Sequence, residues 1–221
     1  MQNRRGLFAG MQSGRLSGFV PYKGTKDLPN AGRISRFIRN FVDMKVALCQ
    51  FSMEWEAAAR NLRRAEELVA QAGADLALLP EMFATGFVTE PWRTALPDEE
   101  ELLAWMRRTA RRYATALAGS AVVRSGDRFA NRFFFVRPDG GAERYDKRHL
   151  FSIGGEDAHI VAGRRRVVVE YGGLRFLPLV CYDLRFPVWC RCRSDYDAIL
   201  CVASWPAPRR EVWRTLLRAR A

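Results

Sequence analysis

Three short segments hold residues whose types suit nucleophilic catalysis, and each lies at the end of a strand-like stretch. The first, LLPEMFATGF at 78–87, presents the carboxylate of Glu81 directly after a proline. The second, RYDKRHLF at 144–151, presents the ammonium of Lys147, and the third, LPLVCYDLRFP at 177–187, presents the thiol of Cys181. Because active-site residues often follow strands, these three side chains are the first candidates for a site.

Each of the three side chains has a chemical role open to it and a plainer structural one. A partly desolvated Glu81 suits a general base near neutral pH, although a glutamate here can also cap the following turn. Lys147 would steady a developing oxyanion and favour a nearby thiolate, although charged residues at strand ends are usually solvated. Cys181 lies just before a turn, as in a nucleophile elbow, although a single cysteine is usually an inert, packed thiol.

Strand-like runs dominate the elements that must position these residues. Short apolar runs predict strands over seven segments: 45–51, 75–79, 117–123, 131–137, 167–171, 174–181 and 197–203. Turn signals at 138–141 and 172–173 indicate hairpins in the middle of the chain.

Three amphipathic segments predict helices. The first begins at Trp55 and ends at Gly73, which supplies a C-terminal cap. The second follows an N-terminal capping signal formed by Asp98 and Glu101, and the third covers 209–221. Because strands alternate with helices and hairpins occupy the middle, we expect an α/β sandwich rather than a doubly wound sheet.

The net charge is concentrated at one end of the chain. The 221 residues are 48% hydrophobic and carry a formal net charge of +12, half of which falls within 1–43. That segment holds eight basic residues, two acidic residues and six glycines, so we expect a disordered basic extension, with Met44 as the natural start of one folded domain over 44–221. This distribution argues against a nucleic-acid partner, and no apolar run is long enough to cross a membrane.

The sequence lacks the marks of several other enzyme classes. It contains no G-x-S-x-G, G-x-G-x-x-G, G-x-x-x-x-G-K-[ST] or H-E-x-x-H pattern. Two histidines and one close cysteine pair, Cys190 and Cys192, are too few for a usual structural zinc site, so we expect no metal. Five cysteines, an odd number without an apolar signal segment, favour free thiols and a cytoplasmic location.

Taken together and in this order, Glu81, Lys147 and Cys181 with their surroundings resemble the catalytic triad of the nitrilase, or carbon-nitrogen hydrolase, superfamily. The resemblance runs from Met44 to the C-terminus. The segments YDKRHLF, CYDLRFP and VASWPAPR resemble the ω-amidase branch, whose members hydrolyse the side amide of α-keto dicarboxylic monoamides such as α-ketoglutaramate and α-ketosuccinamate.

The resemblance implies a thioester mechanism that needs neither a metal nor an organic cofactor. Glu81 would take the thiol proton of Cys181, whose sulfur would attack the amide carbonyl. Lys147 and the backbone N–H of Tyr182 would hold the oxyanion. Glu156 corresponds to an additional glutamate of the family, which positions the lysine and the substrate amide.

Substrate preference is expected to follow from charge and shape. The far carboxylate of an ω-amidase substrate requires a cation, and we expect Arg185 to bind it, unless Arg185 pairs with Asp183 or a neighbouring loop. Phe83, Phe87 and Trp205 would form the apolar walls of the pocket, unless they are ordinary core aromatics.

The resemblance also implies strands beyond the predicted helix at 209–221. Family members continue there with strands that complete the second sheet and with a segment used in dimer contacts. We therefore expect a nitrilase-like α-β-β-α sandwich with C-terminal strands missing, and a homodimer if the full fold is present. Three alternatives stay open: a general aliphatic amidase or N-carbamoyl amide hydrolase with the same triad, a catalytically dead fragment of this fold, and a basic nucleic-acid-binding module.

Overall fold

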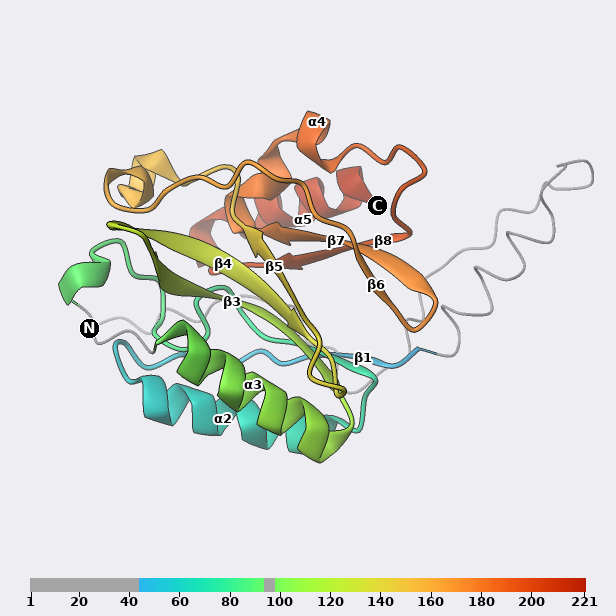
Figure 1. The fold of residues 1–221 in the computed structure, drawn as a ribbon. Helices are drawn as coiled ribbons and strands as arrows, with labels where there is room; N and C mark the ends of the chain where they lie inside the picture. Colours follow the sequence, from blue (N-terminus) through green and yellow to red (C-terminus); the bar gives the residue numbers. More distant parts are fainter. Residues whose placement is uncertain (1–43, 94–97) are drawn as a thin grey trace, which may run out of the picture.

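Two β-sheets lie face to face between two layers of helices (Figure 1). The computed structural model describes residues 44–93 and 98–221, so the predicted extension at 1–43 lies outside the described residues. The α-β-β-α sandwich expected from the resemblance is the observed architecture.

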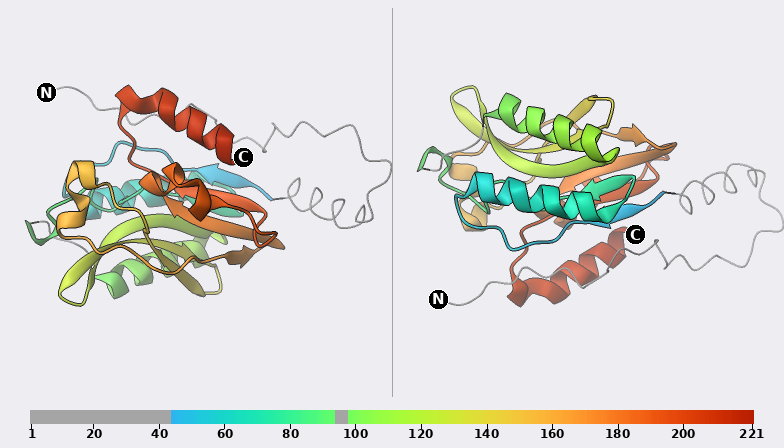
Figure 2. Two further views of the ribbon diagram at one scale, coloured as in Figure 1. Left: turned by 90° about the horizontal axis from the view of Figure 1, so that it is seen from above. Right: turned by 90° about the horizontal axis from the view of Figure 1, so that it is seen from below.

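The first sheet has five strands, whose spatial order is also their order in the chain: β1 (Val46–Leu48), β2 (Leu76–Leu78), β3 (Ala116–Ser125), β4 (Arg128–Val136) and β5 (Ala142–Asp146). The first three run parallel, and β3, β4 and β5 form antiparallel pairs. Two helices, α2 (Ala58–Ala72) and α3 (Glu99–Tyr113), cover the outer face (Figure 2). This topology brings the carboxyl ends of β2 and β5 to the same edge of the sheet.

The second sheet has three strands in the order β6 (Val169–Tyr171), β7 (Leu174–Val180) and β8 (Ala198–Val202). β6 pairs with β7 antiparallel, and β7 pairs with β8 parallel. The short α4 (Pro187–Cys190) and the longer α5 (Arg210–Arg220) lie on its far side, away from the first sheet (Figure 1).

Alternation along the strands divides the apolar core in two. On β4, Phe133 and Phe135 face the second sheet, whereas Phe134 and Val136 face the helices. The cluster that contains Phe133 and Phe135 also includes residues of β5, β7 and β8 and Trp213 of α5: Tyr145, Phe176, Leu177, Leu179, Val180, Leu200, Val202 and Trp213. This division follows from the two-residue period of a strand, which sends successive side chains to opposite faces.

The predicted helix boundaries are partly confirmed. Asp98 caps α3, because its side chain accepts a hydrogen bond from the backbone N–H of Glu100 at 2.9 Å, and Gly73 ends α2 in the left-handed conformation. The prediction that the first helix begins at Trp55 is wrong. The helix begins at Ala58, and Trp55 lies in the preceding turn with 63% of its surface exposed.

Within residues 44–93 and 98–221, five short 3-10 helices occupy the connections: η1 (Pro91–Arg93), η2 (Ser152–Gly154), η3 (Glu156–Ala158), η4 (Cys181–Arg185) and η5 (Ala207–Arg209). Three of them, η3, η4 and η5, carry residues at or near the site described below. Among the described residues, no helix is long and apolar enough to span a membrane.

Candidate active site

Glu81 follows β2 on a tight turn and is completely buried. Its Oε1 accepts hydrogen bonds from Lys147 Nζ and Asn131 Nδ2, each at 2.9 Å, and its Oε2 accepts one from the backbone N–H of Ser204 at 2.8 Å. The next residue, Met82, has a positive φ of 50°, an unfavourable conformation for a residue with a side chain. These contacts fix the orientation of the Glu81 carboxylate within the protein.

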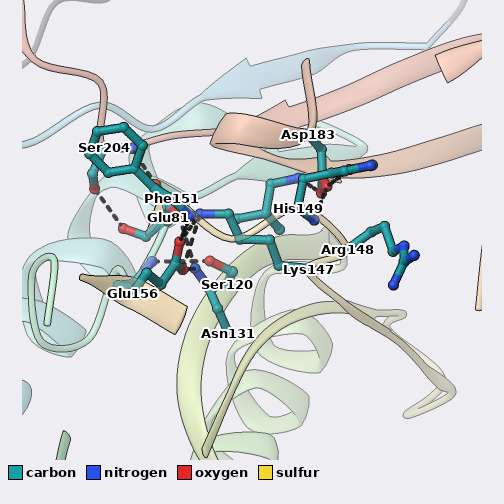
Figure 3. Close-up of polar contacts among 12 residues, drawn as sticks. Glu81, Ser120, Asn131, Lys147, Arg148, His149, Phe151, Glu156, Asp183 and Ser204 are labelled. Carbon is teal, nitrogen blue, oxygen red and sulfur yellow. Dashed lines mark hydrogen bonds and ion pairs between the residues drawn. The ribbon is translucent and has the colours of Figure 1, made fainter. Parts of the chain in front are cut away.

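Lys147 comes directly after β5 and has no exposed side-chain surface. Its ammonium lies 2.9 Å from Glu81 Oε1 and 2.8 Å from Glu156 Oε2 (Figure 3). Burial alone would lower the pKa of Lys147, but the carboxylates of Glu81 and Glu156 outweigh burial and raise it above its usual value. Lys147 is therefore a permanent cation at the bottom of the site.

Glu156 lies on η3 and is also completely buried. Besides both contacts to Lys147 Nζ, its Oε2 accepts a hydrogen bond from the backbone N–H of Phe151 at 2.7 Å. The structure thus places Glu156 beside the lysine, where the resemblance implied it. It joins the segment after β5 to the buried charges.

Cys181 is the first residue after β7 and begins η4. Its φ of 48° lies in the left-handed region, which places the thiol on a sharp turn between strand and helix, as expected for a nucleophile elbow. Burial raises the pKa of the Cys181 thiol well above its usual range, and Glu81 raises it further, whereas Lys147 lowers it. In the resting protein Cys181 is therefore a thiol rather than a thiolate.

Asn131 is a site residue that the sequence analysis missed. This buried side chain on β4 donates from Nδ2 to Glu81 Oε1 at 2.9 Å and to Glu156 Oε1 at 3.0 Å. Its Oδ1 is buried and has no hydrogen-bond partner among the described residues. The signal was available, because Asn131 is an uncharged polar residue inside a strand that is otherwise rich in phenylalanine.

Asp183 is a second missed residue, and it connects the lysine and cysteine segments (Figure 3). Its buried carboxylate accepts hydrogen bonds from Tyr145 Oη at 2.8 Å, from the backbone N–H of His149 at 2.8 Å and from that of Val180 at 3.0 Å. Lys147 lies between Tyr145 and His149 in the chain, and Cys181 follows Val180. Asp183 therefore fixes the lysine and cysteine segments relative to each other. Its ion-pair partner is His149 and not Arg185, so the alternative that Arg185 pairs with Asp183 is wrong.

Aromatic residues and one arginine lie beside the buried charges, each half-buried. The Tyr182 ring lies edge to face with that of Phe151 at 5.3 Å between centroids. The guanidinium carbon of Arg185 is 5.7 Å from the Tyr182 ring centroid and 5.3 Å from that of Trp205. The structure therefore brings Tyr182, Arg185 and Trp205 together as a half-buried rim. In the chain, Tyr182 follows Cys181, and Trp205 follows Ser204, whose backbone N–H binds Glu81.

The two phenylalanines predicted as pocket walls lie elsewhere. Phe83 is completely buried in the core beneath the helices, where its ring centroid is 5.9 Å from that of Trp105, so its assignment to the pocket is wrong. Phe87 is half-buried against a small separate cluster that includes Val88 and Phe129. No group of three or more metal-ligating side chains gathers in the described ranges.

Comparison with known proteins agrees with this geometry. The model of the carbon-nitrogen hydrolase family matches residues 45–221, and the protein belongs to this family. It is a hydrolase that acts on amides.

Individual relatives narrow the class further. An omega-amidase YafV of Yersinia enterocolitica is 48% identical over 179 residues, which cover 80% of this chain and 70% of that protein. A 2-oxoglutaramate amidase of Bacillus subtilis is 30% identical over 183 residues and covers 80% and 71% of the two chains. The crystal structure of XC1258 from Xanthomonas campestris, a CN-hydrolase superfamily protein with an arsenic adduct in its active site, superposes with a TM-score of 0.75. It is 39% identical, with 80% of this chain and 71% of that chain covered.

Replacement of Asn131 tests whether it positions the two glutamates. Asn131→Ala removes donors to two carboxylates, and we expect kcat to fall about 10- to 100-fold, the effect of losing one or two hydrogen bonds to charged groups. Thr115→Ala is the matched control. Thr115 is buried directly before β3, and its hydroxyl donates a hydrogen bond to the Ala74 carbonyl. Steady-state kinetics and thermal unfolding of both variants are the measurements. If the two variants lose stability equally and have equal kcat, the assignment of Asn131 as a positioning residue is contradicted.

The protonation state of Cys181 predicts how its reactivity depends on pH. Because its pKa is raised, the thiolate fraction is small at neutral pH and grows as the pH rises beyond the usual cysteine range. Labelling by methyl methanethiosulfonate, followed by peptide mapping, should therefore accelerate for Cys181 up to and above about pH 9. The exposed Cys192 in the same sample is the internal reference. Labelling of Cys181 that is already at its maximal rate at pH 6 would show a preformed thiolate instead.

Proposed function

We propose that this protein is an ω-amidase, which hydrolyses the terminal amide of an α-keto dicarboxylic monoamide such as α-ketoglutaramate to the keto acid and ammonia. The observation that carries the proposal is a buried lysine and glutamate beside an elbow cysteine, below a rim that offers a cation without a carboxylate partner. The 48% identity to an omega-amidase supports the choice of substrate class.

The first half of the proposed reaction forms a thioester. Glu81 accepts the thiol proton of Cys181 as the sulfur attacks the amide carbonyl, and the resulting oxyanion is held by Lys147 and the backbone N–H of Tyr182. The carbon–nitrogen bond then breaks, and Glu81 returns the proton to the departing nitrogen, so that ammonia leaves. A cysteine that rests as a thiol requires such a base, and Glu81 is fixed beside it.

The second half releases the acid. Glu81 takes a proton from a water molecule, which attacks the thioester, and the proton then returns to the sulfur of Cys181. Asn131 and Glu156 keep the base and the ammonium in place throughout, because Asn131 binds Glu81 Oε1 and Glu156 binds Lys147 Nζ, and neither side chain makes or breaks a covalent bond. No step in this sequence requires a metal or an organic cofactor.

Arg185 supplies selectivity in this proposal. A guanidinium that lies against Tyr182 and Trp205 keeps its in-plane N–H donors available for a carboxylate at the far end of the substrate. All five cysteines are unpaired, which agrees with the cytoplasm as the proposed location.

Ammonia release from α-ketoglutaramate tests the proposed activity. The full 221-residue chain should release ammonia, and Cys181→Ala should reduce the rate to background, because the thioester cannot form. Cys49→Ala is the control, since Cys49 is another buried thiol whose pKa burial raises to about 11. Circular dichroism establishes that each variant is folded. A folded parent that releases ammonia from simple aliphatic or N-carbamoyl amides alone would favour those alternatives, and one active on no amide would be a dead fragment.

Replacement of Arg185 tests the basis of selectivity. Arg185→Met keeps the length and apolar stem but removes the charge, so KM for α-ketoglutaramate should rise about 10- to 100-fold. KM for pentanamide, which carries no carboxylate, should change little. Equal changes for both substrates in steady-state assays would remove Arg185 from substrate selection.

A further inference from the structure

A second arginine, Arg209, also lacks an acidic partner among the described residues. Elsewhere in the described ranges, five half-buried arginines form ion pairs with carboxylates: Arg107, Arg132, Arg137, Arg166 and Arg175. A sixth, Arg220, forms none but donates a side-chain hydrogen bond to the Leu184 carbonyl. Arg185 and Arg209 are half-buried as well, yet neither forms an ion pair with any residue of 44–93 or 98–221. Their charges are therefore available to an external anion.

Arg209 belongs to the same rim as Arg185. Its guanidinium carbon lies 5.0 Å from the ring centroid of Phe151, the residue whose ring meets Tyr182 and whose backbone N–H binds Glu156. The backbone carbonyl of Arg209 accepts a hydrogen bond from Trp205 Nε1 at 2.9 Å. The two arginines thus contact neighbouring aromatic residues that are linked to the buried site.

The position of Arg209 in the chain gives it no evident role in helix stability. It is the residue before α5, and its side chain makes no capping hydrogen bond. A positive charge at this end of a helix meets the positive end of the helix dipole, which is unfavourable. The contact with Phe151 covers only one face of the guanidinium, so its in-plane donors remain available.

We propose that Arg209 is a second specificity-determining residue, which binds the carboxylate end of the substrate together with Arg185. This inference rests on the proposed ω-amidase function. A carboxylate has two oxygens that can accept hydrogen bonds from two guanidinium groups at once, and both arginines lie at the half-buried rim, where screening by salt is weaker than on an open surface.

Three amides that differ in charge and in the keto group test this proposal in Arg209→Gln. They are α-ketoglutaramate, glutaramate, which has the carboxylate without the keto group, and pentanamide, which has neither. We expect kcat/KM to fall about 10- to 100-fold for the two charged amides and to change less than about twofold for pentanamide. Arg209→Lys should recover part of the loss, because it retains the charge without the planar donors.

Arg210→Gln is the matched control, since Arg210 is the next residue and is exposed. It should leave kcat/KM for all three amides within about twofold, the effect of one screened surface charge. A fall of equal size for the three amides in Arg209→Gln would show a structural role and overturn the assignment. A fall for α-ketoglutaramate alone would assign Arg209 to the keto oxygen and overturn the carboxylate assignment.

The same measurements separate failure of this inference from failure of the proposed function. A parent enzyme that prefers charged amides, with an Arg209→Gln variant that keeps this preference, would contradict the role of Arg209 only. A parent that hydrolyses pentanamide as efficiently as α-ketoglutaramate would contradict the ω-amidase proposal and the role of Arg209 together.

Discussion

The ammonium of Lys147 is completely removed from solvent and is paired with two carboxylates, Glu81 and Glu156, which lie 66 and 9 residues away in the chain. An unpaired charge in such a place would cost many kcal/mol, so folding has to bring the end of β2, the end of β5 and η3 to one point. The contacts of Asn131 serve this requirement, because its amide joins Glu81 and Glu156 where two negative charges would otherwise repel each other. Much of the first sheet's topology can be understood as the scaffold for this one cluster.

The balance of charge around Lys147 also determines the state of the nucleophile. Two carboxylates and one ammonium leave the cluster with a net negative charge, which opposes a second anion at Cys181, and burial opposes it further. A free thiolate is therefore not the resting form, and the proton must move as the sulfur attacks. The backbone is strained at Met82, the residue after Glu81, and at Cys181. Both lie on turns that follow strands, and these turns direct the reactive side chains of Glu81 and Cys181 toward the same point, as the proton transfer requires.

Glu81 and Cys181 were predictable because each follows an apolar strand, whereas Lys147 follows β5, a largely polar strand that the apolar runs did not predict. The order of Glu81, Lys147 and Cys181 in the chain carried the family resemblance, and that resemblance implied their roles in catalysis. Residues that act through side-chain contacts were harder to predict. Asp183 resembles an ordinary turn residue in the sequence, and its role depends on donors that lie more than thirty residues away in the chain. The placement of Phe83 failed for a local reason, because the positive φ of Met82 reverses the chain and directs the next side chain into the helix-side core.

The buried cluster and the rim make different demands on the chain. The attack of the Cys181 sulfur on the carbonyl carbon and the departure of the nitrogen are the same for any amide. The cluster of Glu81, Lys147 and Cys181 therefore contributes little to the choice of amide. Discrimination has to come from groups that meet the rest of the substrate, and here these are aromatic rings with two arginines that no described carboxylate neutralises. Leaving a half-buried guanidinium unpaired gives up the stability that the ion pairs of other arginines provide. That loss is understandable if the missing partner is the substrate, because the same charge then contributes to binding only when the correct anion is present.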